Sequence, residues 1–144
     1  MTTKARKPTD WRKRLRCAKP AKTVTLHADF GGVKAGTVMF IATPEIIAGY
    51  VAAIPPGETR SVPRLRNELA RRYKAQATCP VTTAIYLRVV AEAALTDLAE
   101  GAETAAITPF WRVIDPGSAI ARRLTCGDDF IRHQRALEDA APDA

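Results

Sequence analysis

The stretch that decides the fold reads IPPGETRSVPRLRNELARRY and occupies residues 54–73. Its Pro55-Pro56-Gly57 triplet predicts a tight turn. Ser61 is of the residue type that caps the N-terminus of a helix. Three apolar residues then recur at every fourth position and are expected to face the core: Leu65, Leu69 and Tyr73. The stretch therefore predicts a turn and then a helix whose other sides are basic.

Helical periodicity continues on both sides of this stretch. We expect further helices over about residues 10–17, 44–54, 82–98 and 128–138. The expected core residues of the last two are Ile85, Tyr86, Val89, Val90 and Ala93, and Phe130, Ile131 and Leu137. Residues 23–27 and 37–41 predict short strands, and residues 109–118 a loop or small wing. The fold class is therefore mainly α with a small β component, in an order typical of a winged helix-turn-helix domain.

Charge and length suggest how the chain is divided. Its 144 residues fit one domain. Residues 1–22 hold nine basic residues and one acid, a net charge of +8, whereas the whole chain carries +7 and the remainder therefore −1. We expect a basic arm (1–22), short extended segments packed on the domain (23–43), a winged-helix domain (44–139) and a tail (140–144). The arm suits a polyanion, and a solvated disordered tail explains it equally well.

Several classes of protein are excluded by the composition. No apolar run approaches the length of a membrane span, and the basic arm lacks the apolar core of a signal peptide. We therefore expect a cytoplasmic protein, nucleoid-associated if bacterial. Cys17, Cys79 and Cys126 form neither an even disulfide set nor a metal-ligand pattern. Reduced thiols are expected, with no metal and no other cofactor.

Three ordered segments carry a resemblance to a known family. They are Ile54-Pro55-Pro56-Gly57-Glu58 with Ser61, Pro80 leading into the 82–98 helix, and Pro109-Phe110-Trp111-Arg112-Val113-Ile114. They resemble the Pro-x-Gly turn, the recognition helix and the Pro-Cys-His-Arg-Val active-site stretch of the C-terminal domain of alkylguanine-DNA alkyltransferases. The resemblance covers about residues 44–139 and implies a winged helix-turn-helix domain that binds duplex DNA.

Departures from the family motif exclude its reaction at that position. The family cysteine attacks an alkyl group as a thiolate, prepared by a histidine and an orienting glutamate. Here Phe110 stands at the cysteine position and Trp111 at the histidine position, and Glu138 matches the supporting carboxylate. The cysteine-lacking alkyltransferase-like proteins have tryptophan at the cysteine position and keep the histidine, so this chain departs from them too. Phe110 and Trp111 are expected to fill the former pocket or, alternatively, to form a stacking platform for a base.

Candidate DNA contacts follow from the resemblance and from charge. The family's intercalating arginine aligns with Ala84 and its nucleotide-pushing tyrosine with Val62, which weakens the expectation of base flipping. Arg88, one helical turn beyond Ala84, would insert instead, or pair with phosphate or with Glu92. The expected DNA-binding residues are Ser61, Arg64, Arg66, Arg71, Arg72, Arg88 and Arg112, with a structural ion pair as the alternative for Arg112.

Three hypotheses about function remain at this point. The leading one is a non-enzymatic DNA-binding protein, with a link to DNA damage recognition left open. The second is a protein-interaction module that kept the fold without DNA binding. The third is a thiol enzyme that uses Cys126, near the N-terminus of the last helix where thiolates are stabilised, with His133 as its base.

Overall fold

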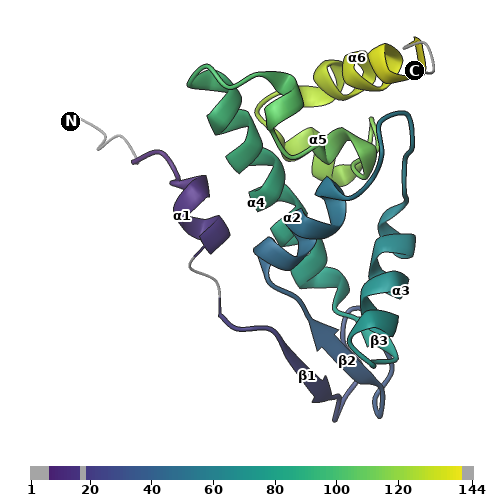
Figure 1. Cartoon of the computed structure of the whole chain (residues 1–144). Coiled ribbons are helices and arrows are strands. Elements are labelled where there is room, and N and C mark those ends of the chain that lie inside the picture. Colours follow the sequence, from purple (N-terminus) through teal and green to yellow (C-terminus); the bar gives the residue numbers. More distant parts are fainter. Residues whose placement is uncertain (1–6, 17–18, 141–144) are drawn as a thin grey trace.

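The computed structural model describes residues 7–16 and 19–140, which form a mainly helical fold with one small sheet (Figure 1). The helices in these residues are α1 (Trp11–Arg16), α2 (Pro44–Ala52), α3 (Val62–Arg72), α4 (Pro80–Ala99), α5 (Ala119–Arg123) and α6 (Gly127–Ala140). Two 3-10 turns, η1 (Thr104–Ala106) and η2 (Phe110–Arg112), lie between α4 and α5. The prediction of a mainly α fold with a small β component is confirmed.

The sheet has three strands in the order β1 (Lys22–Thr25), β2 (Val38–Ile41) and β3 (Ala77–Thr78). β1 and β2 are antiparallel, with Thr23 opposite Phe40, and β2 and β3 are parallel, with Phe40 opposite Thr78. Neighbouring residues of a strand face opposite sides of a sheet. Phe40 accordingly joins the main core, and Met39 joins a small second cluster. The two strands expected from the sequence are present, and β3 is an addition.

Two helices carry the N-terminal caps that predicted them. The Thr43 hydroxyl accepts a hydrogen bond from the Ile46 amide of α2, and the Ser61 hydroxyl accepts one from the Arg64 amide of α3, both at 3.1 Å. Each cap satisfies an amide that the first turn of a helix leaves unpaired. In the turn between the two helices, Gly57 has a φ of +83°, which favours glycine over any other residue.

α4 is the longest helix and lies at the centre of the fold (Figure 1). It contacts α1, α2, α5 and η2. Val89, Val90 and Ala93 are buried as predicted, and Tyr86 is partly buried against the main core. Ile85 is 44% exposed, so the expected core stripe is wrong at its first residue. Ile85 therefore adds apolar surface to the exposed part of α4. Among the described residues, no helix is both long and apolar enough to cross a membrane.

Other expectations about packing need correction. Leu137 is 52% exposed, because the inward side of α6 at that level carries Arg135 and Glu138, which bind polar groups of η2 and its surroundings.

Residues 109–118 form η2 and a turn, and no strand follows β3 in residues 79–140, so that part of the chain has no β-wing. The α3–α4 connection, residues 73–79, contains β3 and is longer than the short turn of a compact helix-turn-helix.

Part of the predicted basic arm forms a helix on the domain. α1 lies along α4, where Arg12 Nη2 is 2.6 Å from carboxylate oxygens of both Asp97 and Glu100. The Trp11 ring lies 5.2 Å from the Arg14 guanidinium and 5.1 Å from that of Arg88. Residues 1–6 and 17–18 of the arm, Cys17 among them, and residues 141–144 of the tail lie outside the described residues.

Candidate nucleic-acid interface

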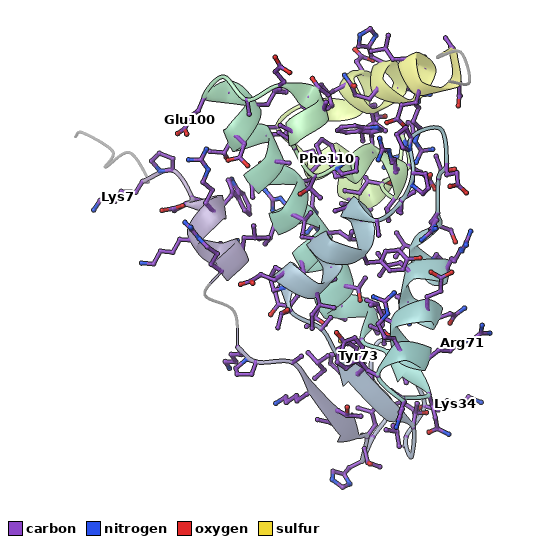
Figure 2. All side chains as sticks on the ribbon, viewed as in Figure 1. Lys7, Lys34, Arg71, Tyr73, Glu100 and Phe110 are labelled. Atoms are coloured by element: carbon purple, nitrogen blue, oxygen red, sulfur yellow. The ribbon has the colours of Figure 1, made fainter. Side chains whose placement is uncertain are left out.

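The residue at the position that the resemblance assigns to cysteine lies in the core. Phe110 is fully buried, and its ring stacks on that of Phe130, with 5.7 Å between centroids. Trp111, 3% exposed, meets Phe110 edge-on at 5.5 Å. Figure 2 shows Phe110 among the helices, away from the outer surface. A buried ring cannot stack on an incoming base, so the geometry favours the filled pocket over the stacking platform.

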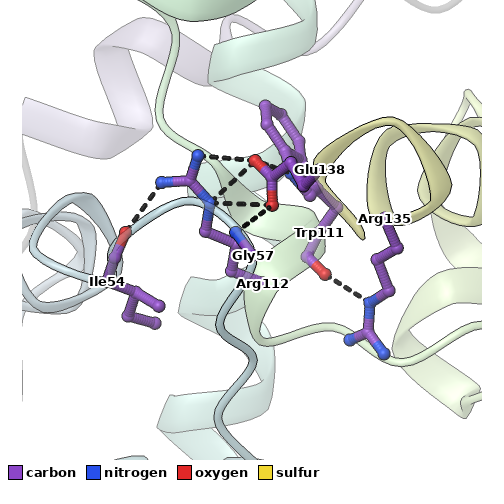
Figure 3. Close-up of polar contacts among 6 residues, drawn as sticks. All are labelled: Ile54, Gly57, Trp111, Arg112, Arg135 and Glu138. Atoms are coloured by element: carbon purple, nitrogen blue, oxygen red, sulfur yellow. Dashed lines mark hydrogen bonds and ion pairs between the residues drawn. The ribbon is translucent and has the colours of Figure 1, made fainter. Parts of the chain in front are cut away.

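Next to these rings, the Glu138 carboxylate of α6 joins three segments of the chain (Figure 3). Oε1 accepts hydrogen bonds from Trp111 Nε1 at 2.9 Å and from Arg112 Nη2 at 2.5 Å. Oε2 accepts one from the Gly57 amide at 3.3 Å. Arg112 Nη1 in turn donates to the Ile54 carbonyl at 2.7 Å. The network ties the turn after α2 to η2 and to α6.

The charges of this network compensate each other. The side chains of Arg112 and Glu138 are only 12% and 14% exposed. Burial by itself would raise the pKa of Glu138, but hydrogen bonds from Arg112, Trp111 and the Gly57 amide, with the charge of Arg112, lower that pKa below its ordinary value. Because its guanidinium is occupied, the geometry favours a structural ion pair for Arg112 and not the expected DNA contact.

Two further hydrogen bonds hold the main chain of η2. Arg135 Nε donates to the Trp111 carbonyl at 2.7 Å (Figure 3), and the Arg60 amide donates to the Arg112 carbonyl at 2.8 Å. A groove of about 490 Å³ lies beside the network, but the Trp111, Arg112 and Glu138 side chains on its wall already have partners. The network stabilises the packing of η2 against α6 and the turn after α2. Neither Phe110 nor Trp111 supplies a nucleophile or a base.

The arginines of α3 differ in what they contact. Arg64 Nε lies 2.8 Å from Glu68 Oε1, and Arg66 Nε donates to the Thr78 carbonyl at 3.1 Å. Arg71 and Arg72, in the last turn, are exposed and have no side-chain partner among the described residues, and Figure 2 shows Arg71 at the outer edge. Ser61, which was also expected to bind DNA, uses its hydroxyl to cap α3. Of the expected DNA-binding residues in this part of the chain, Arg71 and Arg72 are therefore the two whose side chains have no partner among the described residues.

Arg88 lies on α4 beside α1. Its guanidinium is 5.1 Å from the centroid of the Trp11 ring, and its Nε is enclosed without a hydrogen-bond partner among the described residues. Glu92, the alternative partner expected from the sequence, instead accepts hydrogen bonds from the Thr125 amide at 3.0 Å and its hydroxyl at 2.8 Å. Within the described residues, no ion pair neutralises the charge of Arg88.

A first groove, of about 250 Å³, lies between α1, α4 and α5. Its apolar lining consists of Ala84, Ile85, Ala119 and Ile120, and its cations are Arg14, Arg88 and Arg123. No acidic side chain of the described residues lines it, and Ile85 is 44% exposed. The groove therefore suits an anion that also carries an apolar or aromatic surface.

A second groove, of about 480 Å³, meets the first at Arg14, which lines both. Its other residues are Lys19, Pro20, Lys22, Ile41, Ala42, Thr82, Tyr86 and Val89. Again, no described acidic side chain contributes to the lining. We call the two together the α4 grooves, because residues of α4 line both.

Arg123 and Tyr86 are candidate functional residues that the sequence did not single out. The adjacent pair Arg122-Arg123 is a visible basic signal. Its importance depends on the fold, however, because only the packing of α5 against α4 brings Arg123 into the same groove as Arg14.

Cys126 lies in surroundings that disfavour a thiolate. Its Sγ donates a weak hydrogen bond to the Gly127 carbonyl at 3.3 Å. Burial, and then the charge of Glu92, raise the pKa of the Cys126 thiol above its ordinary value. His133, its expected base, is exposed on α6. Because the thiolate is the reactive form, this geometry argues against the thiol-enzyme hypothesis.

Comparisons of the chain with protein-family models, with curated proteins and with solved structures found no match. The resemblance to alkylguanine-DNA alkyltransferases therefore depends on the three quoted segments. In the part of the chain that the structure describes, no group of His, Cys, Asp and Glu side chains is arranged to hold a metal ion.

Proposed function

We propose that this chain is a non-enzymatic DNA-binding protein that contacts the sugar-phosphate backbone with the α4 grooves. The distribution of unpaired cations is the observation that carries the proposal. Five basic side chains line the grooves without an ion pair to any described residue: Arg14, Lys19, Lys22, Arg88 and Arg123.

The described arginines outside the grooves fall into two sets. Six lie within ion-pair distance of a carboxylate: Arg12, Arg60, Arg64, Arg112, Arg132 and Arg135. Five have no ion pair with a described residue and line neither groove: Arg16, Arg66, Arg71, Arg72 and Arg122. Cations that gather in one place without counter-charges repel each other. A row of phosphates would supply those counter-charges, and the release of condensed counterions would add to the affinity.

The resemblance supports the same surface. It places the recognition helix at α4, whose exposed side bears Val81 and Ile85. Arg71 and Arg72, in the last turn of the preceding helix α3, would add outer phosphate contacts. Because Phe110 is buried and has no thiol, the proposal contains no alkyl transfer at that position. Damage recognition stays outside it, since Ala84 and Val62 lack the side chains that the family uses.

Fluorescence anisotropy of a labelled DNA oligomer, titrated with the full chain at several salt concentrations, tests the proposal. With about five phosphate contacts, log K should fall with log[salt] at a slope of about −4.5 on duplex DNA. Absence of binding at low salt would contradict the proposal. Co-purification of a stoichiometric protein partner that survives nuclease, together with absent DNA binding, would favour the protein-interaction module.

A further inference from the structure

We infer that the α4 grooves take single-stranded DNA in preference to duplex, with one base on Tyr86 and a neighbouring base on Ile85. The inference rests on the proposed function and specifies the form of DNA that the site binds. Its basis is that the five cations line concave grooves whose linings also contain apolar and aromatic side chains.

Groove size is the first argument. The grooves measure about 250 and 480 Å³, which suits pieces of a strand and not a whole double helix. In a duplex, the bases are stacked inside and show only their edges in the two grooves of the DNA. A duplex would therefore offer its phosphates to the cations and leave the apolar lining of both grooves without a base to cover it. A single strand is narrow enough to enter, and its bases are free to leave the stack.

The two residues proposed to contact bases are neighbours on α4 and point in different directions. Successive residues of an α-helix are about 100° apart around its axis. Tyr86 accordingly lines the second groove and Ile85, 44% exposed, the first. Arg14 is common to both. A phosphate bound at Arg14 would thus have one base directed toward each groove.

The remaining cations lie where the strand would continue. Lys19 and Lys22 line the second groove, and Arg88 and Arg123 line the first. A basic groove that follows the backbone, combined with side chains on which bases stack, is the arrangement by which proteins bind single strands without reading sequence. An acidic peptide would also satisfy the cations, but it would not depend on the ring of residue 86.

The experiment compares anisotropy titrations of the full chain with a labelled thymidine oligomer of about 12 nucleotides and with a duplex of the same length. We expect tighter binding to the single strand. Tyr86→Leu should weaken single-strand binding about tenfold, as expected for loss of one stacked base, and change duplex binding less than about twofold. Tyr86→Phe, which keeps the ring, should bind like the original chain.

A second measurement does not depend on the folding of a variant. A single-stranded oligomer containing 5-bromodeoxyuridine, photo-crosslinked to the unaltered chain, should attach to the peptide that contains Tyr86. Equal or tighter duplex binding, or crosslinks confined to α3, would overturn the inference while leaving DNA binding intact. Absence of binding to either oligomer at low salt would overturn both the inference and the proposed function.

Discussion

At the scale of single residues, Trp111 stands where the resemblance expects a histidine, and its contacts are structural. Its indole N–H donates to Glu138, and the adjacent Arg112 pairs with the same carboxylate. An indole has no lone pair available to accept a proton, so this hydrogen bond can hold α6 but cannot activate a nucleophile. The carboxylate that the resemblance assigns to catalysis thus has a purely architectural set of partners in this chain.

Glu138 should make stability depend on pH. Its pKa is lowered in the folded state, so its contribution is fully present above its ordinary value of 4.5 and is lost as the pH falls through the folded pKa. Glu138→Gln should cost about 2 kcal/mol at neutral pH, because Arg112 loses its counter-charge, and progressively less below pH 4.5. Urea unfolding at several pH values measures this. A cost that is the same at all pH values would contradict the account.

Phe110 should matter for stability and not for binding. Phe110→Ala removes a fully buried ring and should cost about 3–5 kcal/mol. The control Leu137→Ala, at a side chain 52% exposed, should change stability by less than about 0.5 kcal/mol. Denaturant midpoints of the two variants measure this difference in stability. If Phe110→Leu, the milder change, folds normally yet abolishes DNA binding, then Phe110 belongs to the interface and its assignment to the core alone is wrong.

At the scale of elements, α1 depends on contacts far along the chain. None of its residues is fully buried. Arg12 pairs with Asp97 and Glu100, and Leu15 packs against the main core. We expect Asp97→Asn with Glu100→Gln to release α1, as should high salt, which screens exposed ion pairs. In a Trp111→Phe background, Trp11 is the remaining tryptophan, and its quenching by acrylamide should rise. Unchanged quenching in both conditions would show that other contacts dock α1.

The elements that could be predicted from the sequence are those with local signals. α2 and α3 were predictable because Thr43 and Ser61 cap them locally and their apolar residues repeat at helical spacing. The repeat was wrong at its last member, since Tyr73 follows the end of α3 and is 39% exposed. β3 was not predictable, because a strand of two residues has no periodic signal and forms only where Thr78 pairs with Phe40 of β2. The exposure of Ile85 also could not be predicted, since a stripe of apolar residues does not show which of its members another element will cover.

At the scale of the whole molecule, the proposed interface combines segments that are distant in sequence. Arg14, Arg88 and Arg123 belong to α1, α4 and α5, and only the tertiary fold brings them to one groove. The sequence pointed to the arginines of α3, because a run of charge is visible locally. It could not show that Arg64 would pair with Glu68 or that Arg66 would bind the Thr78 carbonyl.

The most direct test of the central claim compares two charge-matched double variants in salt titrations of DNA binding. Lys22→Gln with Arg123→Gln removes one cation from each of the α4 grooves. The control, Lys34→Gln with Arg132→Gln, removes the same charge from exposed side chains that line neither groove. We predict that the first variant weakens binding and lowers the magnitude of the salt slope by about 1.8 on duplex DNA, or about 1.4 on a single strand, while the control stays close to the original chain. Equal losses of DNA affinity in both variants would show that only net charge matters and would contradict the proposal that the α4 grooves bind the DNA.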